Sequence, residues 1–332
     1  MPECGSQILI CDIPIRYDTY KGCSHGCAYC FVMRKMDISS ISKGEGTEAL
    51  KNFIGGKRNG ECAWCEWDIP LHWGGMSDPF QPIELKYRRS LEAQYPFVVS
   101  TKNKLIAEGE YLELVKQCNC VIQFSAVCKE YDRIEKGAST FEERANAAKK
   151  ISPHKRVIIR AQPYMTGVFK DMLKSIDYFH DAGVHGVVFE GMKYFKKKNN
   201  TVKLGNDYVY PSDILKQHFE AFKEKLHEKG MKFYSGENRL RAMGDDLCCC
   251  GIDGLGWKPN TANLNHYLFN KANYKFTNSM HTNKGNACFF SINQASIVKK
   301  ILREKTFEEV MHLYANSSKF LKMLLPDAKQ KI

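Results

Sequence analysis

Three cysteines in one short stretch are the residues whose types and spacing most clearly indicate chemistry. Cys23, Cys27 and Cys30 stand in YKGCSHGCAYCFV, residues 20–32, and no fourth cysteine lies nearby. A [4Fe–4S] cluster is held by cysteine thiolates and needs one ligand for each of its irons. Three thiolates on one loop therefore leave one iron open to a small molecule. A zinc site that lacks a ligand, or three unrelated thiols, are the alternatives.

Glycines and a strand would position these thiols. Gly22 and Gly26 have no Cβ, so they let the loop wrap closely around a cube of iron and sulfur. The loop follows a predicted strand at 12–17. Further strands are predicted at 69–73, 96–101, 120–126, 157–161, 185–190 and 231–235, and helices near 45–55, 82–94, 103–117, 140–150, 170–181 and 212–229.

The alternation of strands and helices predicts a parallel sheet that is closed or partly closed into a barrel. In such a barrel, the loops that follow the C-terminal ends of the strands build the active site. The three-cysteine loop follows the first strand, and Gly74 and Gly75 follow the second. Lys102 follows the third strand and Ser125 the fourth. We therefore expect these residues at one face of the barrel.

The sequence changes character after about residue 236. It is rich in Gly, Cys and Asn up to about 290, and apolar residues at helical spacing over 297–321 then predict a core-facing pair of helices. No linker rich in Pro, Gly or Ser marks a boundary. We interpret 1–235 as the barrel and 236–332 as a C-terminal extension packed on it.

The cysteine motif resembles the signature of the radical SAM enzymes, CxxxCxΦC, with Tyr29 in the aromatic position. The resemblance implies a [4Fe–4S] cluster whose open iron binds S-adenosylmethionine (SAM). One electron then cleaves SAM to methionine and a 5′-deoxyadenosyl radical, which abstracts hydrogen from a substrate. A reductant such as flavodoxin or ferredoxin is the implied partner.

Further stretches are similar to the spore photoproduct lyase-like branch of that family. YKGCSHGCAYCFV resembles its YxGCxHxCxYCY stretch, and SDPFQPIE at 77–84 resembles its DPYQPxE element. Three shorter matches follow in the same order, namely STKN at 100–103, FSAV at 124–127 and IEKGASTFEERANAAKK at 134–150. The similarity covers about residues 8–190 and implies a partial (β/α)6 barrel of the TIM type and the radical SAM kind.

The resemblance also implies a SAM site, with the three cysteines on the cluster. Tyr29 would lie near the adenine, and Gly74 and Gly75 resemble the backbone that meets the SAM amino group. Lys102 resembles a lysine on the SAM carboxylate, where a cation makes electrostatic sense. Ser125 resembles a hydroxyl at the ribose. Plain structural roles stay open for the last four: a tight turn, a solvated lysine at a helix start and a capping serine.

Two other groups of cysteines raise the question of an auxiliary metal or Fe–S site. Cys62 and Cys65 have the spacing of a metal half-site, and Cys249 and Cys250 stand in a run of three thiols. The two groups could combine into one site. Against this, the first pair precedes the second strand, at the far end of the barrel from the first cluster. Buried free thiols are also common in proteins.

The charge balance bears on the partner. The chain of 332 residues has 49 Lys and Arg against 37 Asp and Glu, a net charge of +12, which suits a polyanion. Aromatic residues alternate with the cationic residues Lys193, Lys196, Lys197 and Lys198, a pattern that favours phosphates and stacked bases. A generally basic surface and a solvated loop are the plain alternatives.

A nucleic-acid base, in a lesion or as a target of modification, is therefore the leading substrate hypothesis. Radical modification of a small molecule or peptide is the alternative within the same chemistry. A cysteine-rich metal-binding or redox protein without SAM turnover is the alternative of another class. We find no signal peptide and no apolar run of the ~18–20 residues that span a bilayer, so we expect a cytoplasmic protein.

Overall fold

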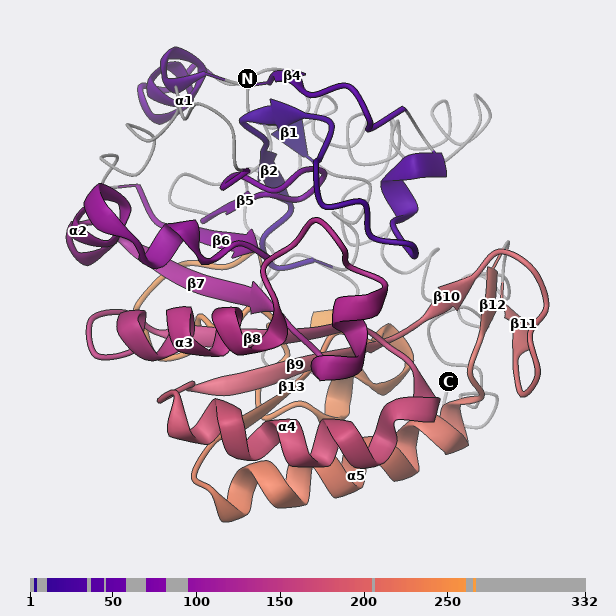
Figure 1. Ribbon diagram of the computed structural model, residues 1–332. Helices are drawn as coiled ribbons and strands as arrows, with labels where there is room; N and C mark the ends of the chain where they lie inside the picture. The colour runs from indigo at the N-terminus through magenta and orange to yellow at the C-terminus, as the bar shows by residue number, and fades with distance from the viewer. Residues whose placement is uncertain are drawn as a thin grey trace, which may run out of the picture.

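The computed structural model describes residues 3–4, 11–34, 37–44, 46–57, 70–81, 95–204, 207–260 and 265–266. Its centre is a sheet with the strand order β1-β2-β5-β6-β7-β8-β9-β13 (Figure 1). These strands are β1 (Glu3–Cys4), β2 (Ile15–Tyr17), β5 (Leu71–Trp73), β6 (Phe97–Thr101), β7 (Cys120–Ser125), β8 (Val157–Tyr164), β9 (Gly186–Gly191) and β13 (Lys232–Ser235).

All neighbouring strands from β2 to β13 are parallel, and β1 is antiparallel to β2. The two ends of the sheet, β1 and β13, do not pair with each other in the described part of the chain. The partial barrel expected from the sequence is confirmed, with β13 as a seventh parallel strand.

Helices cover the outer side of this sheet (Figure 1). They are α1 (Thr47–Ile54), α2 (Gly109–Gln117), α3 (Phe141–Ile151), α4 (Phe169–Asp181) and α5 (Ser212–Glu228), with the 3-10 helices η1 (Phe31–Arg34), η3 (Lys104–Ala107), η4 (Lys129–Arg133), η5 (Thr166–Val168) and η6 (Asn238–Met243). Within the described ranges, no helix has both the length and the apolar character needed to cross a membrane.

Most predicted elements match the structure within a few residues. The sequence did not predict β1 or the two-stranded sheet of β3 (Tyr20–Lys21) and β4 (Ser42–Lys43). The helix expected over 103–117 is two helices, because Glu108 between η3 and α2 is extended, with a φ of −122°, and Gly109 at the start of α2 has a φ of 49°. A small antiparallel sheet that the sequence did not predict follows β9, in the order β10 (Lys193–Tyr194), β12 (Asp207–Val209) and β11 (Val202–Leu204). The predicted helix at 82–94 and the helix pair at 297–321 lie outside the described residues.

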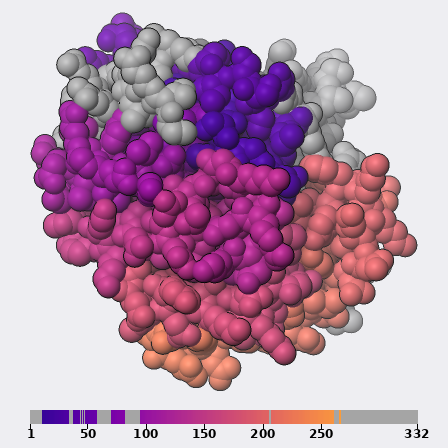
Figure 2. Space-filling view, viewed as in Figure 1, coloured from indigo at the N-terminus to yellow at the C-terminus, as the bar shows by residue number. Residues whose placement is uncertain are grey.

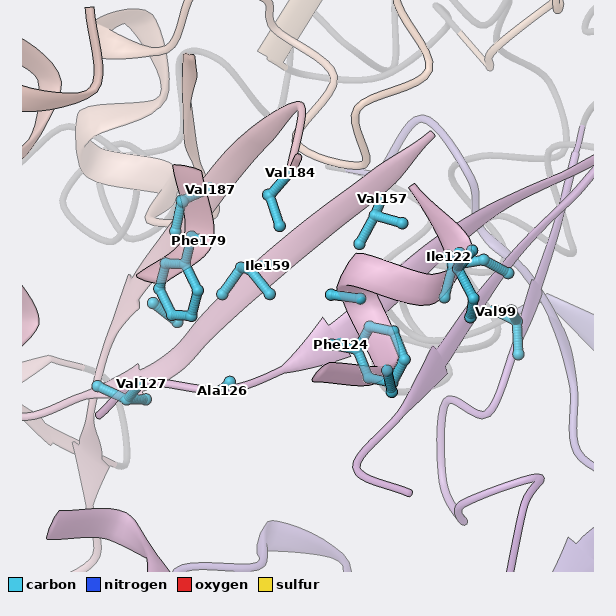
Figure 3. Close-up of a cluster of buried hydrophobic side chains, with 14 of the residues drawn as sticks. Val99, Ile122, Phe124, Ala126, Val127, Val157, Ile159, Phe179, Val184 and Val187 are labelled. Atoms are coloured by element: carbon cyan, nitrogen blue, oxygen red, sulfur yellow. The ribbon is translucent and has the colours of Figure 1, made fainter. Parts of the chain in front are cut away.

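The outer face of the sheet forms the main core. Val99, Ile122, Ile159 and Val187 come from four adjacent strands, and Phe179 of α4 lies among the same buried side chains (Figure 3). Every second residue of a strand points to the same face, so the residues that face the helices are apolar at alternate positions. This packing holds the C-terminal ends of the strands in a fixed row.

The inner face is apolar only in its N-terminal half. Val98, Val121, Ile158 and Val188 are buried there together with Tyr234. A segment that follows η6 covers them, through the buried residues Cys248, Cys250 and Ile252. This segment therefore closes the N-terminal end of the partial barrel. The division into 1–235 and 236–332 stays a prediction, because most of the second part lies outside the described residues.

Asp253 connects the closing segment to the sheet by hydrogen bonds. Its carboxylate accepts a hydrogen bond from the Tyr234 hydroxyl at 2.6 Å and another from the Lys232 ammonium, and its carbonyl accepts one from Arg156. Burial raises the pKa of the Asp253 carboxyl, but the hydrogen bonds from Lys232 and Tyr234 outweigh it and leave the pKa lowered. The carboxylate therefore stabilises the fold when it is ionised.

We expect Asp253→Asn to lower the free energy of unfolding at neutral pH by about 1–3 kcal/mol, the cost of leaving buried partners unsatisfied. A lowered pKa in the folded state means that this contribution is present at neutral pH and lost as the pH falls through that pKa. Thermal unfolding of both proteins between pH 7 and about pH 3 checks this. An unchanged difference over that range would contradict the role of the charge.

Candidate cofactor site

The three-cysteine loop lies between β3 (Tyr20–Lys21) and η1. Gly22 has a φ of 82°, and a Cβ there would lie 2.3 Å from the Ser40 carbonyl oxygen, so only glycine fits. The Cys23 amide donates to the Ile38 carbonyl at 3.0 Å, and the Cys30 amide donates to the Cys27 carbonyl at 3.0 Å. The backbone of the loop is therefore fixed on both sides of the thiols.

Asp78 joins this loop to the end of β6. Its carboxylate accepts hydrogen bonds from the Lys102 amide at 2.6 Å and the Thr101 hydroxyl at 2.8 Å, and it lies 2.9 Å from Nε2 of His25 in the cysteine loop. It also accepts from the Phe80 amide at 2.8 Å, two residues further along the chain. Because Asp78 is only 6% exposed and its oxygens are engaged within the protein, it is a positioning residue and not a substrate ligand.

His25 and Asp78 form a buried ion pair. Nδ1 of His25 lies 3.0 Å from the Gly137 carbonyl, so both ring nitrogens face acceptors. Burial lowers the pKa of His25, but Asp78 and Gly137 outweigh it and leave the pKa raised. Burial likewise raises the pKa of Asp78, and His25 with the backbone donors leaves it lowered. The imidazolium and the carboxylate therefore stabilise each other.

Gln81 and Gly137 hold the cysteine loop from two further sides. The Gln81 amide donates to the Gly22 carbonyl at 3.0 Å and accepts from the Ser24 amide at 2.7 Å. Gly137 donates to the His25 carbonyl at 2.9 Å, and a Cβ on it would lie 2.3 Å from the Ser24 carbonyl oxygen. The quoted motifs contained these residues, but their spacing along the chain gave no indication of this role.

Lys102 and Ser125, which the sequence singled out, lie close to Tyr29 of the cysteine loop. The Lys102 ammonium hydrogen-bonds the Ser125 hydroxyl and lies 5.6 Å from the centre of the Tyr29 ring. Lys102 is not a solvated lysine at a helix start, because its side chain is only 15% exposed. Lys102 follows β6, Ser125 is the last residue of β7 and Tyr29 precedes η1, so the tertiary fold brings together three separate stretches of sequence.

Glu135 contacts both Lys102 and Tyr29, and the sequence did not single it out. Its carboxylate accepts from the Tyr29 hydroxyl, lies 3.3 Å from the Lys102 ammonium, and pairs with the fully buried Arg144 at 2.7 Å. Burial raises the pKa of Glu135, but Lys102 and Arg144 outweigh it and leave the pKa lowered. Arg144 also donates to the Ser125 carbonyl at 2.5 Å. Glu135 therefore orients both ends of the site as an ionised carboxylate.

Gly74 and Gly75 follow β5 at the same edge of the sheet. Gly74 has a φ of 86°, and a Cβ on it would lie 2.5 Å from the Ser100 carbonyl oxygen. Its amide donates to the Tyr17 carbonyl at 3.1 Å. The turn therefore requires glycine at Gly74. The Asp18 carboxylate stabilises the turn by accepting a hydrogen bond from the Met76 amide at 2.9 Å.

The three thiols are the candidate ligands on this loop. They influence one another electrostatically, yet among the described residues no three Cys, His, Asp or Glu side chains are close enough together to hold one metal ion. A cube of irons needs each thiolate on a different iron, so its ligands must be neighbours without converging on one point. Burial raises the pKa of Cys23 and raises the pKa of Cys27 to about 12. A bound cationic centre would supply the charge that ionises them.

The other candidate metal ligands are less informative. Cys249 and Cys250 lie on the segment that closes the N-terminal end of the barrel, far from the loops at the C-terminal ends of the strands. They form no group that could hold a metal ion within the part of the chain that the structure describes. Cys62 and Cys65 lie outside the described residues, so an auxiliary site remains a prediction.

The basic run begins on β10 of the small sheet and continues into the connection between β10 and β11. This part of the chain lies at the right-hand edge of the molecule, below the indigo N-terminal segment (Figure 2). Lys196, Lys197 and Lys198 are exposed, and Phe195 beside them is 45% exposed. Lys193 differs, because its ammonium pairs with Glu190 at 2.5 Å.

Comparisons with known proteins identify the fold. No family model matches the sequence, and no curated protein resembles it at the level of sequence. A solved spore photoproduct lyase with bound AdoMet and dinucleoside spore photoproduct is similar in structure, with a TM-score of 0.55. The match is 15% identical and covers 67% of this chain and 76% of the lyase chain. The two proteins share a fold.

A second protein of known structure has the same arrangement. SuiB of Streptococcus suis, bound to the precursor peptide SuiA, gives a TM-score of 0.54 at 10% identity and covers 96% of this chain and 72% of its own. SuiB bound to S-adenosylmethionine gives a TM-score of 0.51 at 11% identity, with 92% of this chain and 66% of that chain covered. The likeness concerns the architecture, so the activity of this chain is argued from its own residues.

Proposed function

We propose that this chain is a radical SAM enzyme. The observation that carries the proposal is a contact at the C-terminal ends of parallel strands. There, Tyr29 of the CxxxCxxC loop lies beside Lys102 and Ser125. A shared fold with two proteins solved with S-adenosylmethionine supports it. When bound at Cys23, Cys27 and Cys30, a [4Fe–4S] cluster supplies the electron that cleaves SAM into methionine and a 5′-deoxyadenosyl radical.

The side chains around the loop have distinct tasks in this proposal. Lys102 presents a cation to the SAM carboxylate, and Ser125 presents a hydroxyl to the ribose. Tyr29 offers its ring to the adenine, while Glu135 fixes the Tyr29 hydroxyl. The backbone at Gly74 and Gly75 would receive the SAM amino group. Each group is held by a neighbour before any ligand arrives, which lowers the cost of ordering the site.

Anaerobic reconstitution with iron and sulfide, followed by SAM and dithionite, tests this function. We expect 5′-deoxyadenosine and methionine in equal amounts, detected by liquid chromatography and mass spectrometry. An intact cluster, measured by iron content and absorbance, without any 5′-deoxyadenosine would refute the proposal. That outcome would favour a cysteine-rich metal-binding or redox protein instead.

A nucleic acid is the substrate class that we propose. Two features support a nucleic acid, which carries phosphates and stacked bases. They are the net charge of +12 and the exposed Lys196, Lys197 and Lys198 beside Phe195. One structural neighbour was solved with a dinucleoside photoproduct, whereas SuiB was solved with a peptide. A peptide is therefore the second candidate, and a flavodoxin or ferredoxin remains the proposed reductant.

Removing the charge of Lys196, Lys197 and Lys198 together by substitution with glutamine should weaken the binding of a single-stranded oligonucleotide. Each lysine that neutralises a phosphate contributes about 0.7 to the slope of log K against log salt concentration, so the slope should become shallower by about 2. Fluorescence anisotropy over a series of salt concentrations measures it.

The matched control replaces Lys149, Lys150 and Lys174 by glutamine. These lysines lie on the outer helices α3 and α4. The control removes the same net charge, so it separates a local contact from a general effect of the field. Equal slopes for the two triple variants, or no affinity of the unmodified protein at low salt, would contradict the proposed contact.

A further inference from the structure

A line of polar side chains crosses the inner face of the sheet above its apolar half. The line is continuous: Nε2 of His72 lies 2.9 Å from the Ser100 hydroxyl, which donates to the Gln123 amide oxygen at 3.0 Å. Arg160 donates to the same oxygen at 3.3 Å and, through Nε, to the amide oxygen of Gln162. One signal of this line is visible in the sequence, namely polar residues at alternate positions of otherwise apolar strands.

These side chains mark where the inner face opens. Arg160 and Gln162 are partly exposed, while Ile158, two residues earlier on the same strand and face, is fully buried. The register pairs Arg160 with Ser125 of β7, and the Ser125 hydroxyl lies 3.4 Å from the Gln162 carbonyl. Arg160 therefore stands one strand away from the proposed ribose contact, facing the same interior.

Among the described residues, no carboxylate pairs with the Arg160 guanidinium. The hydrogen bonds that its side chain makes in the described part of the chain go to the neutral amide oxygens of Gln123 and Gln162. The nearest carboxylate along this line, Glu190, is engaged by the Gln162 amide and by the Lys193 ammonium at 2.5 Å. A partly buried guanidinium normally has a charged partner, because the two amides cannot neutralise it.

The positive field at this position extends to His72. Burial lowers the pKa of His72 to about 3, and the charges of Arg160 and Arg16 contribute in the same direction. The imidazole is therefore neutral at physiological pH and does not add a competing charge. Arg160 is the guanidinium in this line of polar side chains, so an anion that enters the open half of the barrel would contact it. A guanidinium binds phosphate oxygens through parallel hydrogen bonds.

We propose that Arg160, oriented by Gln123 and Gln162, binds a phosphodiester of the nucleotide whose base is the reaction target. This assignment rests on the proposed function, because it places the substrate beside the SAM site. The exposed lysines that follow β9 favour a nucleotide over a peptide carboxylate, since they continue the positive charge outward from the strand next to Arg160. The amides of the two glutamines would hold the guanidinium in place.

A comparison of two probes tests the proposal on the unmodified holoprotein. The first is a short single-stranded oligonucleotide, and the second has the same sequence with neutral methylphosphonate linkages. We expect the holoprotein to bind the first more tightly, and Arg160→Gln to lower that affinity by about 10- to 100-fold, as expected for a hydrogen bond to a charged group. The variant should also lose most of the preference between the probes, and Arg160→Lys should retain part of it.

Three results would overturn the assignment. Equal affinity of the holoprotein for both probes would exclude a phosphate contact, whether or not the variant folds. A loss of SAM affinity in Arg160→Gln as large as the loss of oligonucleotide affinity would place the guanidinium in the cofactor site. Binding of an acidic peptide that Arg160→Gln abolishes, by a holoprotein that does not bind the oligonucleotide, would make the substrate a peptide. Cleavage of SAM by the unmodified holoprotein is measured separately, so a failure there counts against the proposed function and not against Arg160.

Discussion

Replacing Cys27 by alanine should abolish the formation of 5′-deoxyadenosine from SAM. Cys27 is the most buried of the three thiols on the loop, and a cluster with two remaining protein ligands cannot keep an iron at each corner. We expect the iron content after reconstitution to fall from about four per chain toward zero. Iron analysis, the absorbance of the cluster and quantification of 5′-deoxyadenosine measure the three consequences.

Cys128→Ala is the matched control for this variant. Cys128 is also a buried free thiol, but it lies after β7 and belongs to the outer hydrophobic core. Removing its sulfur should cost a small amount of stability and leave iron binding intact. Full iron content and normal 5′-deoxyadenosine formation in Cys27→Ala would refute the ligand assignment. Loss of iron in both variants would show that stability and not ligation had been measured.

Replacing Asp78 by alanine should destabilise the protein and disorder its cofactor site at once. The change leaves the buried His25 imidazolium without its partner, and breaking a buried ion pair costs about 3–5 kcal/mol. It also removes the acceptor of the Lys102 amide and the Thr101 hydroxyl. We expect the Tm to fall by about 10 °C and the reconstituted cluster to release iron faster to a chelator.

Asp78→Asn separates shape from charge, and Asp171→Asn is the control. The asparagine has nearly the same shape but cannot pair with the His25 imidazolium, so it should retain only part of the lost stability. Asp171 lies on the partly exposed surface of α4, 3.9 Å from Lys174, and its substitution should change the free energy of unfolding by no more than about 0.5 kcal/mol. An Asp78→Ala protein with unchanged Tm and iron retention would contradict the role of Asp78 as the joint between loops.

Much of the sheet could be predicted from the chain, and the reason is periodicity. A strand such as 120–125 alternates between an outer face packed on helices and an inner face, and each parallel strand is buried on both sides in its N-terminal half. The small sheet after β9 escaped prediction, because its strands are short and partly exposed. Short exposed strands lack the apolar pattern that makes longer ones recognisable.

The candidate site divides in the same way. The sequence by itself determined the order of its parts: three cysteines after the first strand, then Gly74, Lys102 and Ser125 after the next three. That order follows from chain connectivity, because each loop is tied to the end of its own strand. The sequence also places glycines at Gly22 and Gly74, where the structure shows a positive φ and a close carbonyl oxygen that leave no room for a side chain.

Only the tertiary structure decided which side chains meet. The decisive contacts join residues that are distant in the chain, namely Asp78 with His25, Glu135 with Tyr29, and Arg160 with Gln123. Hydrogen bonds and charges act over a few ångströms of space, whatever the separation in sequence. Spacing along the chain carries no information about such pairs. The sequence thus set the chemistry that the loop can perform, and the fold set the charges that surround it.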